Sequence, residues 1–264
     1  MSLSPSPRPL TAVVDRLRAA GCVFAEDEAE LIVSTARTPD DVAAMVERRA
    51  AGLPLEQVLG WAEFRGLRVS VDPGVFVPRR RTEFLVAEAA ALARPGAVVV
   101  DLCCGTGAIG AAIAAAVGGV ELHAVDVDPA AVRCARRNLA ALGGRVHEGD
   151  LYAPLPAGLR GRAGVVVACA PYVPTGEIRL LPAEAREHEP HVALDGGSDG
   201  LAVVRRVIAE APAWLAPGGS LLLETSERQA PDALEAVAAA GLVARLACSG
   251  ELNATVVAGT LARS

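Results

Sequence analysis

A glycine-rich segment that follows a short apolar run is the first part of this chain with the composition of a binding site. Residues 97–102 (AVVVDL) lead directly into Gly105, Gly107 and Gly110. Glycines at such a place let the backbone approach a ligand closely at the carboxyl edge of a sheet. The spacing matches the dinucleotide-binding fingerprint and predicts a site for a cofactor that contains adenosine.

Carboxylates near the ends of apolar runs extend this site. Asp126 ends the run 120–126, where its oxygens can accept hydrogen bonds from two ribose hydroxyls. Asp150 and Leu151 follow a third run, and we expect them to meet the edge and face of an adenine ring. Asp101 precedes the glycines, and its negative charge disfavours a pyrophosphate but suits an ammonium group. These acids favour S-adenosyl-L-methionine as the cofactor, with NAD as the alternative.

The elements that must position these residues alternate along the chain. We expect strands at 97–102, 120–126, 144–148, 164–169, 219–225 and 242–247, and helices at 107–117, 129–142, 199–216 and 230–240. Nearly continuous apolar strands separated by helices are typical of a parallel sheet covered on both faces. Three shorter helical patterns come first, at 10–20, 26–37 and 39–52, and helices this short must pack together to be stable.

Composition sets the class of protein. The 264 residues suffice for one α/β domain of about 200 residues and a small accessory domain. A net charge of −6 argues against a nucleic acid as the main partner, since phosphate contacts need a basic surface. The six cysteines lack the spacing of metal ligands, so we expect reduced thiols and no metal. Without a signal peptide or an apolar stretch of about 18 residues, the expected location is the cytoplasm.

Several segments of the chain resemble a known family. Residues 101–107 and 125–129 resemble the nucleotide-binding motifs of class I methyltransferases. Residues 55–66 (LEQVLG, then EFRG) are similar to the linker of the glutamine-N5 protein methyltransferases that act on peptide-chain release factors. The proline–arginine motif at 77–79 and the loop 184–201 resemble the same family, and the similarity runs from about residue 50 onward.

The resemblance implies a fold and a reaction. The fold is α/β, a class I (Rossmann-like, seven-stranded) S-adenosylmethionine-dependent methyltransferase with a small N-terminal helical domain and a hairpin linker. The domains are then 1–61 for substrate recognition, 62–77 for the hairpin and 78–264 for catalysis. The reaction moves a methyl group to the side-chain amide nitrogen of a glutamine in a Gly-Gly-Gln loop. The implied partner is a release-factor-like protein, and the enzyme is expected to be a monomer.

The resemblance also assigns site residues. Those expected to bind the cofactor are Asp101, Cys103, Gly105, Gly107, Asp126, Val127, Asp150 and Leu151. Those expected to bind the substrate are Phe76, Pro78, Arg79 and Glu189, and the expected catalytic segment is Cys169, Ala170, Pro171 and Tyr172.

The catalytic segment departs from the family's Asn-Pro-Pro-Tyr motif. An amide nitrogen is a poor nucleophile, and in the family the Asn oxygen and the next carbonyl accept its two hydrogens. Here the Ala170 carbonyl and Tyr172 remain, but Cys169 supplies only a weak sulfur acceptor. Losing one strong acceptor costs about 2–4 kcal/mol of transition-state stabilisation, by analogy with an oxyanion-hole donor.

Three functions follow from this departure. The chain is an amide methyltransferase with altered efficiency, a methyltransferase for another protein nitrogen or a small metabolite, or a cofactor-binding protein with little turnover. An adenine methyltransferase for nucleic acids is a further alternative, because such enzymes share a similar motif; the acidic net charge of the chain counts against it.

The family has one arginine followed by Pro and Glu where this chain has Arg79, Arg80 and Arg81, which we interpret as a solvated cluster. Glu224 is expected to hydrogen-bond within the fold.

Overall fold

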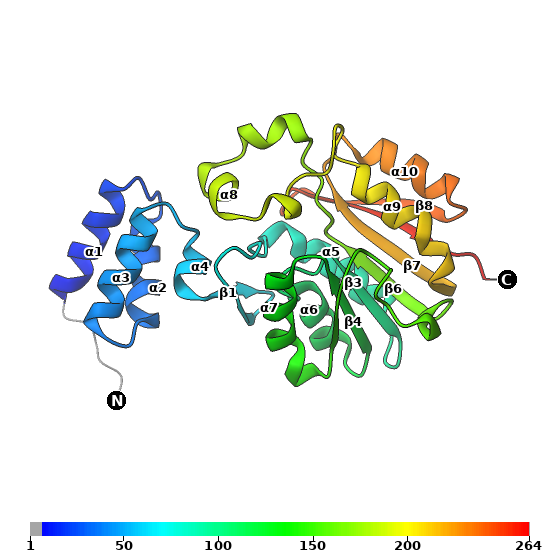
Figure 1. The fold of residues 1–264 in the computed structure, drawn as a ribbon, viewed down its shortest axis with the longest axis horizontal. Helices are drawn as coiled ribbons and strands as arrows, with labels where there is room; N and C mark the ends of the chain where they lie inside the picture. The colour runs from blue at the N-terminus through cyan, green and yellow to red at the C-terminus, as the bar shows by residue number, and fades with distance from the viewer. Residues whose placement is uncertain (1–6, 264) are drawn as a thin grey trace.

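The computed structural model describes residues 7–263 and opens with four helices that form a small cluster of their own. Residues 1–6 of the predicted N-terminal domain lie outside the described residues. The helices are α1 (Pro7–Ala19), α2 (Ala25–Thr35), α3 (Pro39–Ala50) and α4 (Leu55–Leu59). Leu17, Ile32 and Val46 fill the space between them. Figure 1 shows this cluster at one end of the molecule, apart from the sheet.

The start of helix α3 is fixed by a capping box. Thr38 accepts a hydrogen bond from the backbone N–H of Asp41, and the Asp41 carboxylate accepts one from the N–H of Thr38. This reciprocal capping box, with Pro39 in the first turn, satisfies N–H groups that a helix start leaves free.

A two-stranded hairpin follows, formed by β1 (Trp61–Phe64) and β2 (Leu67–Ser70). Its turn is Arg65-Gly66, and both residues have positive φ, at 50° and 74°. Such a two-residue turn matches the twist of the paired strands. The predicted hairpin reached residue 77, but pairing ends at Ser70, and the chain from Val71 to Val77 has no strand.

The rest of the chain forms a seven-stranded sheet of order β5-β4-β3-β6-β7-β9-β8. Its strands are β3 (Val98–Leu102), β4 (Glu121–Asp126), β5 (Arg145–Glu148), β6 (Ala163–Ala168), β7 (Leu215–Thr225), β8 (Val243–Ser249) and β9 (Ala254–Thr260). The first five in this order run parallel, and β9 is antiparallel to both β7 and β8. The seven-stranded α/β fold expected from the sequence is confirmed.

Helices cover both faces of the sheet (Figure 1). On one face lie α5 (Glu83–Leu92), α6 (Ala108–Val117) and α7 (Pro129–Leu139); on the other lie α9 (Ala202–Glu210) and α10 (Ala230–Ala239). Each face has its own core, with Ile113 and Leu85 in the first and Trp214 and Ile208 in the second. Both cores are fully buried, as a largely parallel sheet requires.

The loop 184–201, which we call the substrate-side loop, joins the two parts of the molecule. It contains most of the short helix α8 (Ala183–His188) and meets the N-terminal helices directly. Arg49 of α3 donates to Glu184 at 3.1 Å, and the Gln57 amide donates to the backbone oxygen of His188 at 3.5 Å. The same guanidinium forms a pair with the buried Glu28 of α2 at 2.6 Å. Between residues 7 and 263, no helix is long and apolar enough to cross a membrane.

Candidate active site

The glycine-rich segment forms a tight turn between β3 and α6. Gly105 and Gly107 have positive φ, at 55° and 77°, and Cys103 adopts a similar conformation at 54°. A side chain at Gly107 would also be crowded, because an added Cβ would lie 3.1 Å from Cγ of Leu139 and Leu139 would have to shift. The turn therefore holds bare backbone at the carboxyl edge of the sheet, where such folds bind their ligands.

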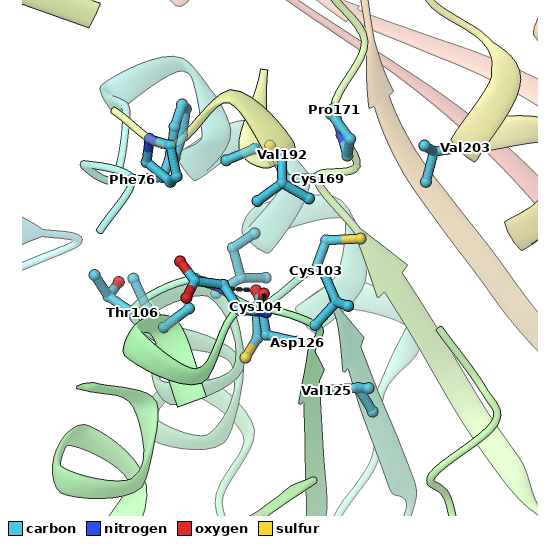
Figure 2. Close-up of a pocket in the computed structure, with 18 of the residues that line it drawn as sticks. Phe76, Cys103, Cys104, Thr106, Val125, Asp126, Cys169, Pro171, Val192 and Val203 are labelled. Carbon is cyan, nitrogen blue, oxygen red and sulfur yellow. Dashed lines mark hydrogen bonds between the residues drawn. The ribbon is translucent and has the colours of Figure 1, made fainter. Parts of the chain in front are cut away.

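Asp126, at the end of β4, holds this turn in place. Its Oδ2 accepts a hydrogen bond from the Gly105 N–H at 2.8 Å, and its Oδ1 accepts one from the Asp128 N–H at 2.9 Å. Burial raises the pKa of Asp126 above the ordinary range of an aspartate. Figure 2 shows Asp126 beside the turn, near Cys103 and Cys104.

Asp101 lies behind the turn and does not line the cavity that the turn borders. Its carboxylate is fully buried, and Oδ2 accepts a hydrogen bond from the Gly110 N–H at 2.9 Å. Its Oδ1 has no hydrogen-bond partner among the residues described. Burial raises the pKa of Asp101 to about 7, and the nearby charge of Asp126 adds to this effect. A cation bound close to the turn would meet this uncompensated oxygen.

The first cavity lies over the turn and brings together most residues predicted to bind the cofactor. Those that line it are Cys103, Gly105, Asp126, Val127, Asp150 and Leu151. Gly107, like Asp101, does not line this cavity. The bare glycine backbone, the carboxylates and the largely apolar remainder fit S-adenosylmethionine, whose sulfonium and ammonium carry positive charge and whose adenosine needs apolar contact.

Several residues of this cavity were not among the predicted site residues, and three of them come from segments that no motif marks. Val192 comes from the substrate-side loop, and Val203 and Arg206 come from α9. Arg206 forms an ion pair with Asp150 at 2.5 Å, so the acid expected at the adenine is already partnered. These residues belong to no local motif, and only the packing of α9 against the edge of the sheet brings them here.

A second cavity opens on the far side of the predicted catalytic segment. Both cavities are lined by six common residues, which are Phe76, Arg79, Thr82, Cys169, Pro171 and Ala193. Ala170, Tyr172 and Glu189 line only the second cavity. Figure 2 shows Phe76, Val192, Cys169 and Pro171 across the first cavity from Cys104 and Asp126. A group bound in the first cavity therefore meets a group bound in the second at Cys169 and Pro171.

The catalytic segment follows β6 directly. Burial raises the pKa of the Cys169 thiol well above its ordinary value, so the side chain stays neutral at physiological pH. A neutral thiol is a weak hydrogen-bond acceptor and a poor nucleophile. The Tyr172 carbonyl accepts a hydrogen bond from the Gln229 amide at 2.9 Å, which holds the segment against the start of α10.

Glu189 joins the proline–arginine motif to the substrate-side loop. Its Oε1 accepts hydrogen bonds from Arg79 at 2.5 Å and from the Val77 N–H at 3.2 Å. Burial raises the pKa of Glu189, and the charge of Arg79 opposes that rise. The Arg79 guanidinium also lies 5.0 Å from the centre of the Phe76 ring. The wall shared by the two cavities is thus fixed to the loop that carries α8.

The buried Glu224, the partly buried Tyr172 and the exposed Arg81 form a cluster that lines the second cavity. Arg81 Nε and the Tyr172 hydroxyl both donate to Glu224 Oε1, each at 3.1 Å. The interpretation of Arg81 as part of a solvated cluster is therefore incomplete, because its guanidinium has a specific partner within the site. The sequence gives no sign of this pair, since its two members are 143 positions apart. No group of three or more His, Cys, Asp or Glu side chains in the described part of the chain could hold a metal ion.

Comparisons with known proteins find methyltransferases. The family model described as "Methyltransferase small domain" matches residues 66–172. A release factor glutamine methyltransferase from Geobacter sulfurreducens is 40% identical over 74% of this chain and 70% of its own length. Another from Cereibacter sphaeroides is 36% identical over 88% of this chain and 90% of its own.

One relative of similar identity has a different name. A 4-amino-L-phenylalanine/4-methylamino-L-phenylalanine methyltransferase from Streptomyces pristinaespiralis is 39% identical over 70% of this chain and 65% of its own length. Among solved structures, a methyltransferase from Pyrococcus furiosus matches 83% of this chain and 98% of its own at a TM-score of 0.58. At 17% identity, this last likeness concerns the fold alone.

Proposed function

Because the chain belongs to the release factor glutamine methyltransferase family, we propose that it methylates the side-chain amide nitrogen of a glutamine in a protein of the release factor class. The enzyme is an S-adenosylmethionine-dependent N-methyltransferase, and its cofactor supplies a methyl group activated by a positively charged sulfur. The observation that carries the proposal is the meeting of two cavities at Cys169 and Pro171.

In the first cavity, the proposed roles follow from position and charge. Asp126 accepts hydrogen bonds from the ribose, and Val127 and Leu151 contact the adenine, with Asp150 at its edge. Cys103 and Gly105 lie along the methionine portion, and Gly107 keeps the turn in the shape that this requires. The buried Asp101 charge attracts the ammonium group from behind the turn.

In the second cavity, the substrate glutamine would lie between the catalytic segment and the proline–arginine motif. The Ala170 carbonyl accepts one amide hydrogen and orients the nitrogen, and Tyr172 closes one side of the cavity. Phe76 and Arg79 form the opposite wall, with Arg79 fixed by Glu189, and Pro78 lines the first cavity beside them. Holding the nitrogen in line with the methyl group removes much of the entropic barrier to transfer.

A small aromatic amine is a second candidate for the methyl acceptor. The methyltransferase from Streptomyces pristinaespiralis is named for an amino acid of this kind. An aromatic amine keeps more of its lone pair than an amide does, and it depends less on the asparagine that Cys169 replaces. The guanidiniums of Arg79 and Arg81 in the same cavity would attract the carboxylate of a free amino acid.

The setting in which the enzyme works is part of the proposal. We propose a cytoplasmic monomer whose N-terminal helices help to recognise the protein substrate, and whose partners include neither a membrane nor a nucleic acid. The contacts of Arg49 and Gln57 with the substrate-side loop support a role for those helices next to the acceptor cavity. The net charge of −6 weighs against nucleic acid.

The test is transfer of labelled methyl from S-adenosylmethionine to purified release factor and, separately, to 4-amino-L-phenylalanine. The natural protein is compared with Cys169→Asn and with the control Cys248→Asn, since Cys248 is exposed and far along the chain from the site. We expect label on the glutamine of the Gly-Gly-Gln loop, with a rate that rises in Cys169→Asn and is unchanged in the control.

Three other results of this experiment would change or refute the proposed function. Label on the free amino acid alone would replace the protein substrate with a small amine. Label on release factor only with Cys169→Asn would identify a site that no longer methylates amides. Binding of the cofactor without transfer to either acceptor, in all three proteins, would refute the proposed function.

A further inference from the structure

A buried carboxylate with one unpartnered oxygen lies beside the place of the missing asparagine. Glu224 is at the end of β7, its side chain is 3% exposed, and it lines the second cavity. Its Oε1 is occupied by Arg81 and Tyr172. Its Oε2 is buried and, among the residues that the structure describes, has no hydrogen-bond partner. Leaving a buried charged oxygen unpaired is costly, so a bound group that supplies a hydrogen would be favoured.

The register of the sheet places Glu224 next to Cys169. Strands β6 and β7 are parallel neighbours, and Ala168 pairs with Leu223. Cys169 follows Ala168 directly after β6, and Glu224 follows Leu223 in β7, so the two lie side by side at the end of the paired region. The charge of Glu224 contributes to the raised pKa of the Cys169 thiol, after burial itself. Glu189 also has an unpartnered oxygen in this cavity, but its bonded neighbours are Val77 and Arg79 on the opposite wall.

We propose that Glu224 Oε2 accepts the hydrogen bond from the methyl-accepting nitrogen that the asparagine oxygen accepts elsewhere in the family. With the Ala170 carbonyl, it gives both hydrogens of an NH₂ group an acceptor and leaves the nitrogen lone pair directed at the methyl group. This inference rests on the proposed function and names the group that orients its acceptor.

Arg81 is the residue that pairs with the other oxygen of Glu224, Oε1. The family has a glutamate at this position of the proline–arginine motif, and a carboxylate there would repel Glu224. Arginine instead donates to Oε1 of Glu224, and Oε2 is left without a partner in this ion pair. The change to arginine and the change to Cys169 therefore belong together, since one secures a new acceptor where the other removes the old one.

Glu224→Gln tests the proposal sharply because the amide can take only one orientation. Arg81 and Tyr172 both donate to the position of Oε1, so the glutamine oxygen must stay there. The NH₂ group then occupies the position of Oε2, and it can donate a hydrogen bond but cannot accept one. The variant thus removes the acceptor while it keeps the shape of the side chain and its two bonds.

The experiment is a double-mutant cycle of Glu224→Gln with Cys169→Asn, measured as kcat/KM for methyl transfer. In the natural background we expect Glu224→Gln to lower kcat/KM roughly 100-fold, mostly through kcat. With Asn at position 169 the loss should shrink to about tenfold or less, because the asparagine oxygen accepts the same hydrogen. Glu177→Gln, an exposed glutamate paired with Arg228, is the matched control and should change nothing. Equal losses in both backgrounds, or none in the natural one, would overturn the proposal.

A binding measurement separates this proposal from the proposed function. Sinefungin carries an amino group where the cofactor carries its methyl group, so its cation would lie close to Glu224. We expect Glu224→Gln to weaken sinefungin about tenfold and to leave S-adenosylhomocysteine unchanged. This result would support the placement of Glu224 even if neither acceptor is methylated by the natural protein. Equal affinities of sinefungin for both proteins would count against it.

Discussion

The buried charge of Asp101 makes cofactor binding depend on pH. In the free enzyme the pKa of Asp101 is raised to about 7, so the side chain is largely protonated below that pH. A bound cation favours the carboxylate, so binding should lower this pKa and release a proton. Affinity for S-adenosylmethionine should therefore rise as pH increases from about 5.5 to 7 and level off above that range.

Calorimetry in buffers of different ionisation enthalpy measures this release directly. At pH 6 the natural protein should release a fraction of a proton per cofactor bound, and Asp101→Asn should release none. Asp199→Asn is the control, because that carboxylate is exposed and Arg205 lowers the pKa of Asp199 to about 2. An affinity that does not vary between pH 5.5 and 8 would contradict the assignment of Asp101.

At the scale of single residues, the sequence identified what local patterns encode. Asp126 and Gly105 could be found because the glycine spacing and the strand that follows lie within one short stretch of chain. Glu224 and Arg81 could not, because their contact depends on the order of strands in the sheet. Val203 and Arg206 were missed for a similar reason, since nothing in the sequence of α9 marks the end that faces the cofactor cavity.

At the scale of elements, the turn before α6 should tolerate no side chain at its last position. Gly107→Ala combines an unfavourable positive φ, which costs about 1–2 kcal/mol, with contact between its Cβ and Leu139. Gly119→Ala has the same backbone cost at φ 61°, but no atom lies within 4 Å of its added Cβ. The first variant should lose about 1–3 kcal/mol more stability than the second. Urea unfolding without cofactor measures the difference, and equal losses would show that Leu139 moves freely aside.

Element boundaries were predicted less well where small residues or proline interrupt a pattern. The helix expected over 199–216 is α9 followed by a short 3₁₀ turn, because Pro212 cannot supply the N–H that a continuous helix needs. Strand β7 then begins at Leu215, four residues earlier than expected. Strand β9 was not identified in its own right, since Ala and Gly occur within its seven residues and weaken the usual strand signature.

At the scale of the whole molecule, Arg49 connects the N-terminal helices to the catalytic part. Its side chain is 12% exposed and pairs with Glu28, which is 9% exposed. Removing one partner of a buried pair leaves the other charge uncompensated, so Arg49→Met should cost about 3–5 kcal/mol of stability. Arg16→Met breaks an exposed pair with Glu47 and should lower the stability much less, because solvent screens that pair.

Chemical unfolding of the two variants, followed at several wavelengths, gives this comparison. If the helices recognise the protein substrate, Arg49→Met should also raise KM for release factor more than it lowers kcat. Similar stability losses in the two variants would mean that the Arg49 pair is no more important than a surface pair. The sequence predicted three of these four helices and did not identify α4, and no pattern in it links Arg49 to the loop around Glu184.

The position of β9 between β7 and β8 also governs how the chain is completed during synthesis. Strand β7 is synthesised before β9, and in the sheet described β8 pairs with β9 alone. From Thr225 to Thr260, translation takes roughly 2–7 s at the usual rate of elongation. During that interval one long apolar edge of the nascent sheet has no partner and is open to wrong pairing. Chaperone binding to the growing chain should therefore be strongest in this interval and end when the last strand inserts.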